Sequence, residues 1–206
     1  MQEIVAIIDR SGSMAGKESD TIGGINATID QLKKTKEANE KINFSLKFFD
    51  HNSYVRIRSL DIEQIRPIPV NELRPRGQTA LLDAMGDTIL FFINKKLLDS
   101  NSFESCIIYV ATDGYENASK KYTNETMKTL IEQAKTFKIE ILYLGANQDA
   151  IFESSKFGLD CNQAINYSER QDTVESAYRN VGNVAKRYRS GAPVAFTQGE
   201  RQDSVM

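Results

Sequence analysis

The sequence of 206 residues has few of the residues that build zinc and iron–sulfur centres, because it contains two cysteines and one histidine. Cys106 and Cys161 stand far apart and show no metal-ligand spacing, so neither kind of centre is expected. Cys106 lies within an apolar run, which favours a small buried thiol over one half of a disulfide.

Long hydrophobic runs are also missing. No stretch approaches the roughly 20 apolar residues that a membrane helix needs, and no basic segment followed by a long apolar stretch opens the chain. We therefore expect a soluble, cytoplasmic protein with no membrane partner. The formal net charge of −2 argues against a dedicated nucleic-acid surface, so no nucleic-acid partner is expected either.

The remaining composition is typical of a globular protein, with 26% charged and 40% hydrophobic residues. The length favours one α/β domain, and we find neither an internal repeat nor a second domain. The patterned part of the sequence predicts a domain over residues 1–190. The polar segment that follows, 191–206, contains glycine and proline and predicts a flexible C-terminal tail.

Apolar runs alternate with segments of helical period, which is typical of a doubly wound sheet with helices on both faces. Strands are expected at residues 4–8, 44–48, 54–58, 107–111, 139–144 and 164–167, and helices at 22–32, 81–92, 127–137, 150–157 and 174–188. Only Asp50, His51, Asn52 and Ser53 separate the second and third strands. A connection this short requires an antiparallel hairpin, so one antiparallel edge strand should join a mostly parallel sheet.

Three segments place oxygen-bearing side chains where they can meet. Asp9, Ser11 and Ser13 follow the first apolar run, Thr79 opens a helix after a long connection at 62–76, and Asp113 ends another buried strand. In an open α/β sheet, ligands bind beyond the carboxyl ends of the strands, where the strand order reverses. If the two strands are neighbours, all five side chains reach one crevice.

The chemistry of these five donors indicates a hard cation. Every donor is an oxygen, and few protein ligands with several neutral hydroxyls suit Mg²⁺, for which Mn²⁺ is an expected substitute. Each segment alone also has a structural explanation: serines and Asp9 cap helices, Thr79 is a helix N-cap, and Asp113 is a turn residue. Their joint position favours a metal site, although the sequence does not decide whether Asp9 or Asp113 binds the ion directly.

The pattern Asp9-x-Ser11-x-Ser13, with Thr79 and Asp113, resembles the metal-ion-dependent adhesion site (MIDAS) of von Willebrand factor type A domains. The resemblance covers roughly residues 2–190, and the flanking segments are most similar to stand-alone bacterial and phage members. It implies a central sheet with one antiparallel edge strand and flanking helices. It also implies that the serines and the threonine contact the metal directly, and that the two aspartates act through water or one of them becomes a direct ligand. A partner's Asp or Glu then completes the shell.

We therefore expect a Mg²⁺-dependent protein-binding module and not an enzyme. The first alternative is a metal-assisted phosphoester hydrolase. The sequence argues against it, because it lacks a glycine-rich loop that could bind phosphate and shows no evident base for Ser11 or Ser13. The second alternative is a scaffold that does not use its metal site. Around the site we expect an exposed His51. Asp83 is either a brace for the Thr79 loop or a solvated helix carboxylate. Four residues are candidates for a rim around the metal, with ordinary surface as the alternative: Arg10, Tyr115, Glu116 and Asn117.

Overall fold

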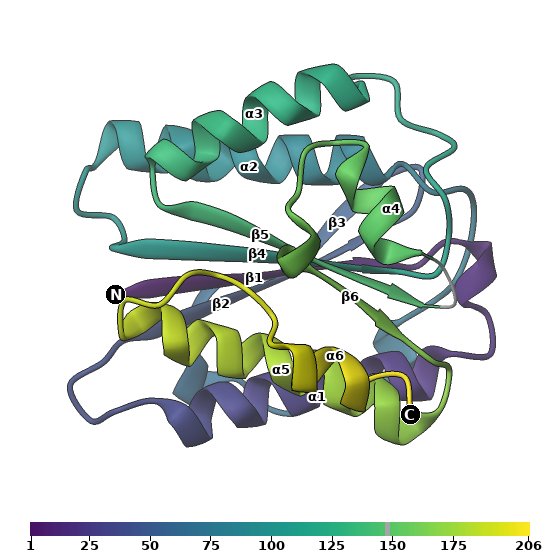
Figure 1. Cartoon of the computed structure of the whole chain (residues 1–206), viewed down its shortest axis with the longest axis horizontal. Coiled ribbons are helices and arrows are strands. Elements are labelled where there is room, and N and C mark those ends of the chain that lie inside the picture. Colours follow the sequence, from purple (N-terminus) through teal and green to yellow (C-terminus); the bar gives the residue numbers. More distant parts are fainter. Residues whose placement is uncertain (147–148) are drawn as a thin grey trace.

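The computed structural model describes residues 1–146 and 149–206, and its centre is a six-stranded sheet in the order β3-β2-β1-β4-β5-β6. All neighbouring strands run parallel except β2 and β3, which pair antiparallel. The strands are β1 (Gln2–Asp9), β2 (Ile42–Phe49), β3 (Ser53–Asp61), β4 (Ser105–Thr112), β5 (Ile139–Ala146) and β6 (Ala164–Tyr167). The predicted sheet with one antiparallel edge strand is confirmed (Figure 1).

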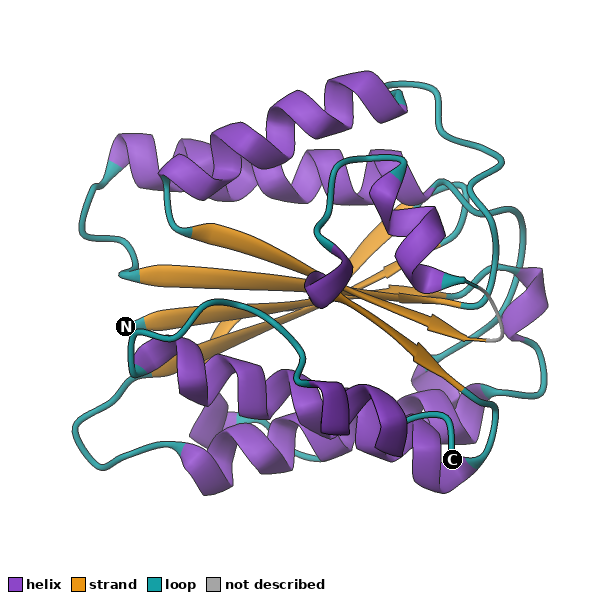
Figure 2. Cartoon of the chain, viewed as in Figure 1, coloured by secondary structure: helices purple, strands orange, loops and turns teal. Residues whose placement is uncertain are grey.

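Helices cover both faces of the sheet (Figure 2). They are α1 (Glu18–Thr35), α2 (Leu81–Leu98), α3 (Asn124–Thr136), α4 (Ala150–Ser155), α5 (Gln171–Arg189) and α6 (Gln198–Asp203). In the view of Figure 1, α2 and α3 lie above the sheet, and α1, α5 and α6 lie below it. The predicted helical stripes are buried against the sheet, except that Phe137 and Tyr188 at their ends are only partly buried.

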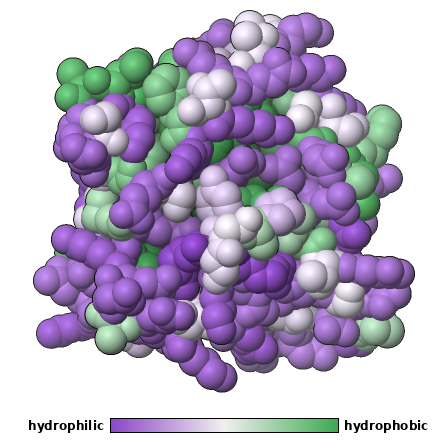
Figure 3. All heavy atoms as spheres, turned by 60° about the vertical axis from the view of Figure 1, so that its left-hand side comes forward, coloured by the Kyte–Doolittle hydropathy of each residue, from purple (hydrophilic) through white to green (hydrophobic). Residues whose placement is uncertain are grey.

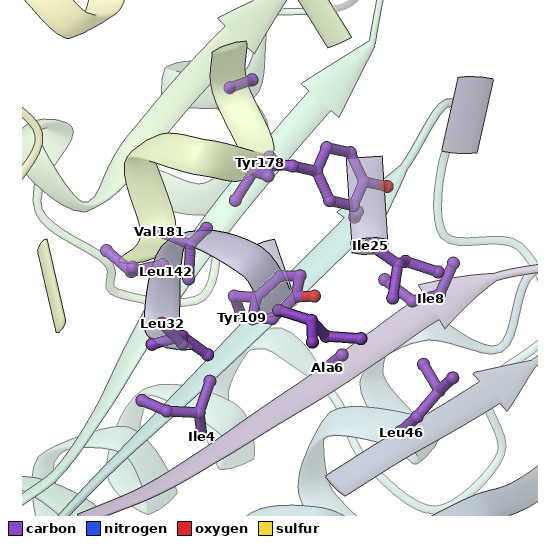
Figure 4. Packing of buried hydrophobic residues seen from close by; sticks show 14 of the residues in the cluster. Ile4, Ala6, Ile8, Ile25, Leu32, Leu46, Tyr109, Leu142, Tyr178 and Val181 are labelled. Carbon is purple, nitrogen blue, oxygen red and sulfur yellow. The ribbon is translucent and has the colours of Figure 1, made fainter. Parts of the chain in front are cut away.

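The two faces of β1 supply two separate cores. Ile4, Ala6 and Ile8 belong to the cluster between the sheet and the helices α1 and α5, which Figure 4 shows from close by. Val5 and Ile7 point to the opposite side and pack with residues of α2 and α3. Because successive side chains of a strand alternate between its faces, a continuously apolar strand is what a sheet covered on both sides requires.

The edge of the sheet departs from the simple pattern at Lys47. Alternation of apolar and polar residues at 44–48 predicts a strand near the edge of the sheet. The structure places β2 next to the edge strand β3, but Lys47 is only 9% exposed because α2 lies over it. The sequence pattern did not reveal that a helix covers this lysine.

The C-terminal segment is packed on the domain, so the prediction of a flexible tail at 191–206 is wrong. Val194 and Phe196 are buried, and the segment ends in α6, whose first turn is held by a capping box at Thr197. Arg187 of α5 donates two hydrogen bonds to the carboxylate of Glu200, at 2.7 and 2.8 Å. The prediction failed because the segment is polar on average. This average does not show the two buried apolar residues, Val194 and Phe196, or the bidentate ion pair of Glu200 with Arg187.

The surface is mostly hydrophilic on the face shown in Figure 3, where hydrophobic atoms gather in the upper part, at the height of α2 and α3. At the C-terminal end of α2, Leu97 and Leu98 are 64% and 90% exposed. None of the helices built by the described residues combines the length and hydropathy that crossing a membrane requires.

Candidate metal site

The turn after β1 gathers the first three oxygen donors. Asp9 is the last residue of β1 and is fully buried, and its Oδ1 accepts a hydrogen bond from the backbone N–H of Ser11 at 2.6 Å. A short 3₁₀ helix at Gly12–Met14 then turns the chain back, which brings the hydroxyls of Ser11 and Ser13 to 3.0 Å from each other. The strand thus delivers one carboxylate and two hydroxyls within five residues.

The loop before α2 is fastened to this turn by backbone hydrogen bonds. The N–H of Gly12 donates to the carbonyl of Gly77 at 3.0 Å, and the N–H of Arg76 donates to the carbonyl of Arg10 at 2.7 Å. Gly77 has a φ of +69°, a conformation that favours glycine, and a Cβ there would collide with the ring of His51. These contacts hold Thr79, which is 3% exposed, beside the β1 turn.

The end of β4 completes the cluster. Thr112 donates a hydrogen bond to Asp9 Oδ2, and Asp113 Oδ1 accepts one from the hydroxyl of Ser13, both at 2.6 Å. A Cβ on Gly114 would lie 3.1 Å from Thr79 Oγ1, 3.4 Å from Ser13 Oγ and 3.7 Å from Asp9 Oδ2. The structure therefore brings all five predicted residues together, because β1 and β4 are neighbours and the glycine leaves room between their turns.

Asp9 carries a charge that the protein does not neutralise. Burial raises the pKa of its carboxyl to about 6, although the hydrogen bonds from Thr112 and Ser11 lower this pKa in part. No lysine, arginine or histidine among the described residues forms an ion pair with Asp9. A buried carboxylate without a cation is costly, so this position suits a bound positive ion.

Asp113, in contrast, already has a cationic partner. Lys17, in the turn that precedes α1, forms ion pairs with Asp113 and with Glu169, and the latter lies between β6 and α5. Both carboxylates keep the pKa of the Lys17 ammonium raised, although burial opposes this. Sequence reasoning missed Lys17 and Glu169. The only sequence signal was that Lys17 lies four residues after Ser13, at the start of a helix.

The residues expected at the rim divide into supports and exposed side chains. Asn117 supports the site, since its side-chain oxygen accepts from the N–H of Thr79 at 3.0 Å and its own N–H donates to the carbonyl of Thr79 at 3.1 Å. Glu116 accepts from the N–H of Leu82 at 2.9 Å and caps α2. Tyr115 is 60% exposed.

Further positions on the same side act as braces. Asp83 accepts hydrogen bonds from the backbone N–H groups of Lys120 and Lys121, both at 2.9 Å, so its carboxylate holds the loop that follows Asp113. Arg10 turns inward and forms an ion pair with the buried carboxylate of Asp50 at 3.0 Å. His51, next to that carboxylate, is half exposed, as predicted for a turn histidine.

The donor set fits a hard divalent cation. Among the described residues, no group of three or more histidines, cysteines or acids could hold a metal ion by itself, so hydroxyl oxygens would have to contribute to any site. Three neutral hydroxyls, one unpaired buried carboxylate and one ion-paired carboxylate are donors that suit Mg²⁺ with water in the remaining positions.

Comparisons place this fold among known structures. No family model matches the chain, and no curated protein matches it. The von Willebrand factor domain of the pilus tip protein Mfa5 from Porphyromonas gingivalis matches with a TM-score of 0.64 at 12% identity, over 96% of this chain and 98% of that chain. Manganese-loaded TRAP protein from Plasmodium vivax matches with a TM-score of 0.60 at 19% identity, over 82% and 69%.

A third similar structure is proximal thread matrix protein 1 from the mussel byssus with a zinc-occupied MIDAS motif. It matches with a TM-score of 0.59 at 15% identity, over 90% of this chain and 46% of that chain. The chain thus spans less than half of the mussel protein. Together these similarities show that the chain has the fold of a von Willebrand factor type A domain.

Proposed function

We propose that the chain is a Mg²⁺-dependent protein-binding module whose partner presents an Asp or Glu side chain to the metal. The observation that carries the proposal is the buried carboxylate of Asp9, which has no cationic partner among the described residues and lies among three hydroxyls. The manganese-loaded and zinc-occupied structures of similar fold support a metal at this place. Mn²⁺ is the expected substitute for Mg²⁺.

The hydroxyls of Ser11, Ser13 and Thr79 would hold the ion, and Asp9 and Asp113 would balance its charge. A bound Mg²⁺ supplies a coordination position that accepts a carboxylate. Lys17 forms an ion pair with Asp113 and so competes with the metal for that carboxylate. An ion bound mainly by neutral hydroxyls keeps its affinity for an anionic ligand, which is the property that a metal-mediated contact requires.

Residues around the site hold its geometry. Asn117 fixes the backbone of Thr79 on both sides, and Glu116 and Asp83 tie α2 to the loop after β4. The exposed ring of Tyr115 lies two residues after Asp113 and offers a partner an apolar contact beside the metal. Specificity for one partner would then come from such exposed rim residues and not from the metal itself.

The test is a pull-down from the native host, done with Mg²⁺ and with chelator, using wild-type protein and Asp9→Ala. We expect a partner that is retained with Mg²⁺ and lost both with chelator and in the variant, while thermal unfolding shows that the variant stays folded. Asp30→Ala, at an exposed carboxylate of α1, is the matched control and should retain the partner. A partner that is retained equally in chelator would contradict the proposal and favour the scaffold alternative.

The same proteins distinguish a binding module from a hydrolase. A panel of phosphoesters is incubated with the Mg²⁺-loaded protein, and turnover is compared with that of Asp9→Ala. We expect no turnover above the level of the variant. Turnover that depends on both Asp9 and Mg²⁺ would contradict the binding module and favour metal-assisted hydrolysis.

A further inference from the structure

A pocket of about 160 Å³ lies at the edge of the sheet, between β2, β3 and α2. Its walls are largely apolar, with Val5, Val55 and Phe91 among them. Val55 and Phe91 are 40% and 44% exposed, so the pocket opens to solvent between them.

The floor of this pocket contains a buried amine. Lys47 is 9% exposed, and its Nζ donates to the carbonyl of Ala84 at 3.1 Å and to the hydroxyl of Thr88 at 3.0 Å. An ammonium has three N–H donors, and within the described residues the third has no acceptor. No carboxylate of these residues forms an ion pair with Lys47, and burial lowers the pKa of its amine to about 8.

A second cation stands at the mouth of the pocket. Arg58 of β3 lies over the ring of Phe91, with the guanidinium carbon 5.3 Å from the ring centroid, and it has no ion-pair partner in the described part of the chain. Asp87 also lines the pocket, but its carboxylate forms an ion pair with Lys121 at 2.7 Å. Asp87 also attracts the Lys47 ammonium without forming an ion pair with it. The pocket therefore combines apolar walls with two cations that have no ion-pair partner among the described residues.

The size and the charge of the pocket together define its ligand. A cavity of about 150 Å³ holds one benzene molecule, so the apolar body of the ligand is about one ring or one branched aliphatic group. An anionic head is needed to neutralise a buried cation, since an unpaired charge of this kind is costly. A carboxylate matches both the third donor of Lys47 and the planar guanidinium of Arg58.

We propose that the pocket between β2, β3 and α2 is a binding site for a free small carboxylate with a ring-sized apolar body, held by Lys47 and Arg58. The site is distinct from the metal cluster, because none of the five metal-site residues lines the pocket. Helix α2 connects the two places, since it begins just after Thr79 and carries Thr88 and Phe91.

The test is a titration of the full chain with benzoate, followed by NMR amide shifts and performed in chelator so that no metal can bind the carboxylate. We expect saturable shifts confined to residues around Val55, Arg58, Thr88 and Phe91. Benzamide, which is neutral and of the same shape, should bind at least tenfold more weakly, and so should acetate, which lacks the apolar body. Equal affinity for benzoate and benzamide would overturn the proposal. So would benzoate shifts located elsewhere, or no shifts at 20 mM benzoate, a concentration on the order of the Kd of a weak fragment.

Variants test the two cations separately. Lys47→Met should lower benzoate affinity at least tenfold, and Arg58→Gln about threefold, because Arg58 is exposed and its charge is screened. Arg56→Gln is the matched control on the same strand, since Arg56 forms an ion pair with Glu72 and does not line the pocket, and it should leave the affinity unchanged. Unchanged affinity in both Lys47→Met and Arg58→Gln, with unfolding curves showing folded proteins, would overturn the proposal.

Discussion

Replacing Asp9 by asparagine should stabilise the metal-free protein and abolish its response to metal. Burial raises the pKa of the Asp9 carboxyl from 3.8 to about 6. The native state therefore holds a proton that the unfolded chain has already released between these pH values, and wild-type stability falls as the pH rises through this window. Two pKa units correspond to about 3 kcal/mol of destabilisation at pH 7.

Asparagine retains the shape of the side chain but loses part of its hydrogen bonding. The N–H of Ser11 still finds an acceptor, whereas the hydrogen bond from Thr112 must be rearranged, at a cost of about 1 kcal/mol. We therefore expect Asp9→Asn to be about 1–2 kcal/mol more stable than wild type at pH 7 in chelator. This advantage should decrease towards pH 4, where Asp9 is protonated in the native wild-type protein.

The assay is urea unfolding of both proteins at pH 7 and pH 4, with chelator and with Mg²⁺. Saturating metal at 100 times its Kd adds about 2.7 kcal/mol to a protein that binds it, so Mg²⁺ should make wild type the more stable protein at pH 7. Two results would refute the reasoning: an asparagine variant less stable than wild type in chelator at pH 7, or a stability difference that is the same at both pH values.

Four further substitutions test other parts of the structure. Lys17→Ala removes the cation that competes for Asp113 and should tighten Mg²⁺ binding about tenfold by calorimetry, since a partly buried charge pair contributes about 1–2 kcal/mol; unchanged or weaker binding would contradict this competition. Thr79→Ala should weaken Mg²⁺ binding at least tenfold without changing the unfolding curve in chelator, whereas equal affinity would place the ion elsewhere. Lys47→Met should add about 1–2 kcal/mol to stability at pH 7. The native pKa near 8 lies below the unfolded value of 10.5, which corresponds to about 3 kcal/mol, and the loss of the two Lys47 hydrogen bonds offsets part of this gain. That gain should disappear as the pH rises from 8 to 10.5, and a gain that is constant with pH would count against the lowered pKa. Phe196→Ala should lower the free energy of unfolding by about 3 kcal/mol, while a flexible tail would give no change.

Much of the fold could be predicted from the sequence, because the spacing of apolar residues within each strand and helix indicates which of its faces is buried. The apolar run at residues 4–8 predicted a strand covered on both sides, and the short connection after Phe49 predicted the antiparallel hairpin. Phe196 was missed for the opposite reason. Its burial depends on a surface formed by distant segments, and a short polar segment gives no periodic signal for such docking.

The candidate site divides in the same way. Asp9, Ser11, Ser13, Thr79 and Asp113 were predictable because a loop at the carboxyl end of a strand must face the same edge as its neighbours. The ion pairs of Lys17 were not predictable, since a lysine near the start of a helix has many solvated conformations. The choice of Asp113 and Glu169 as its partners depends on loops that only the folded chain brings together.

The most direct test of the metal-dependent account is a crystal of the protein soaked in Mn²⁺, measured at a wavelength where manganese scatters anomalously. The account predicts one strong anomalous peak among the hydroxyls of Ser11, Ser13 and Thr79, which disappears in crystals of Asp9→Asn. No peak among these three hydroxyls at saturating Mn²⁺, or an unchanged peak in the variant, would contradict it.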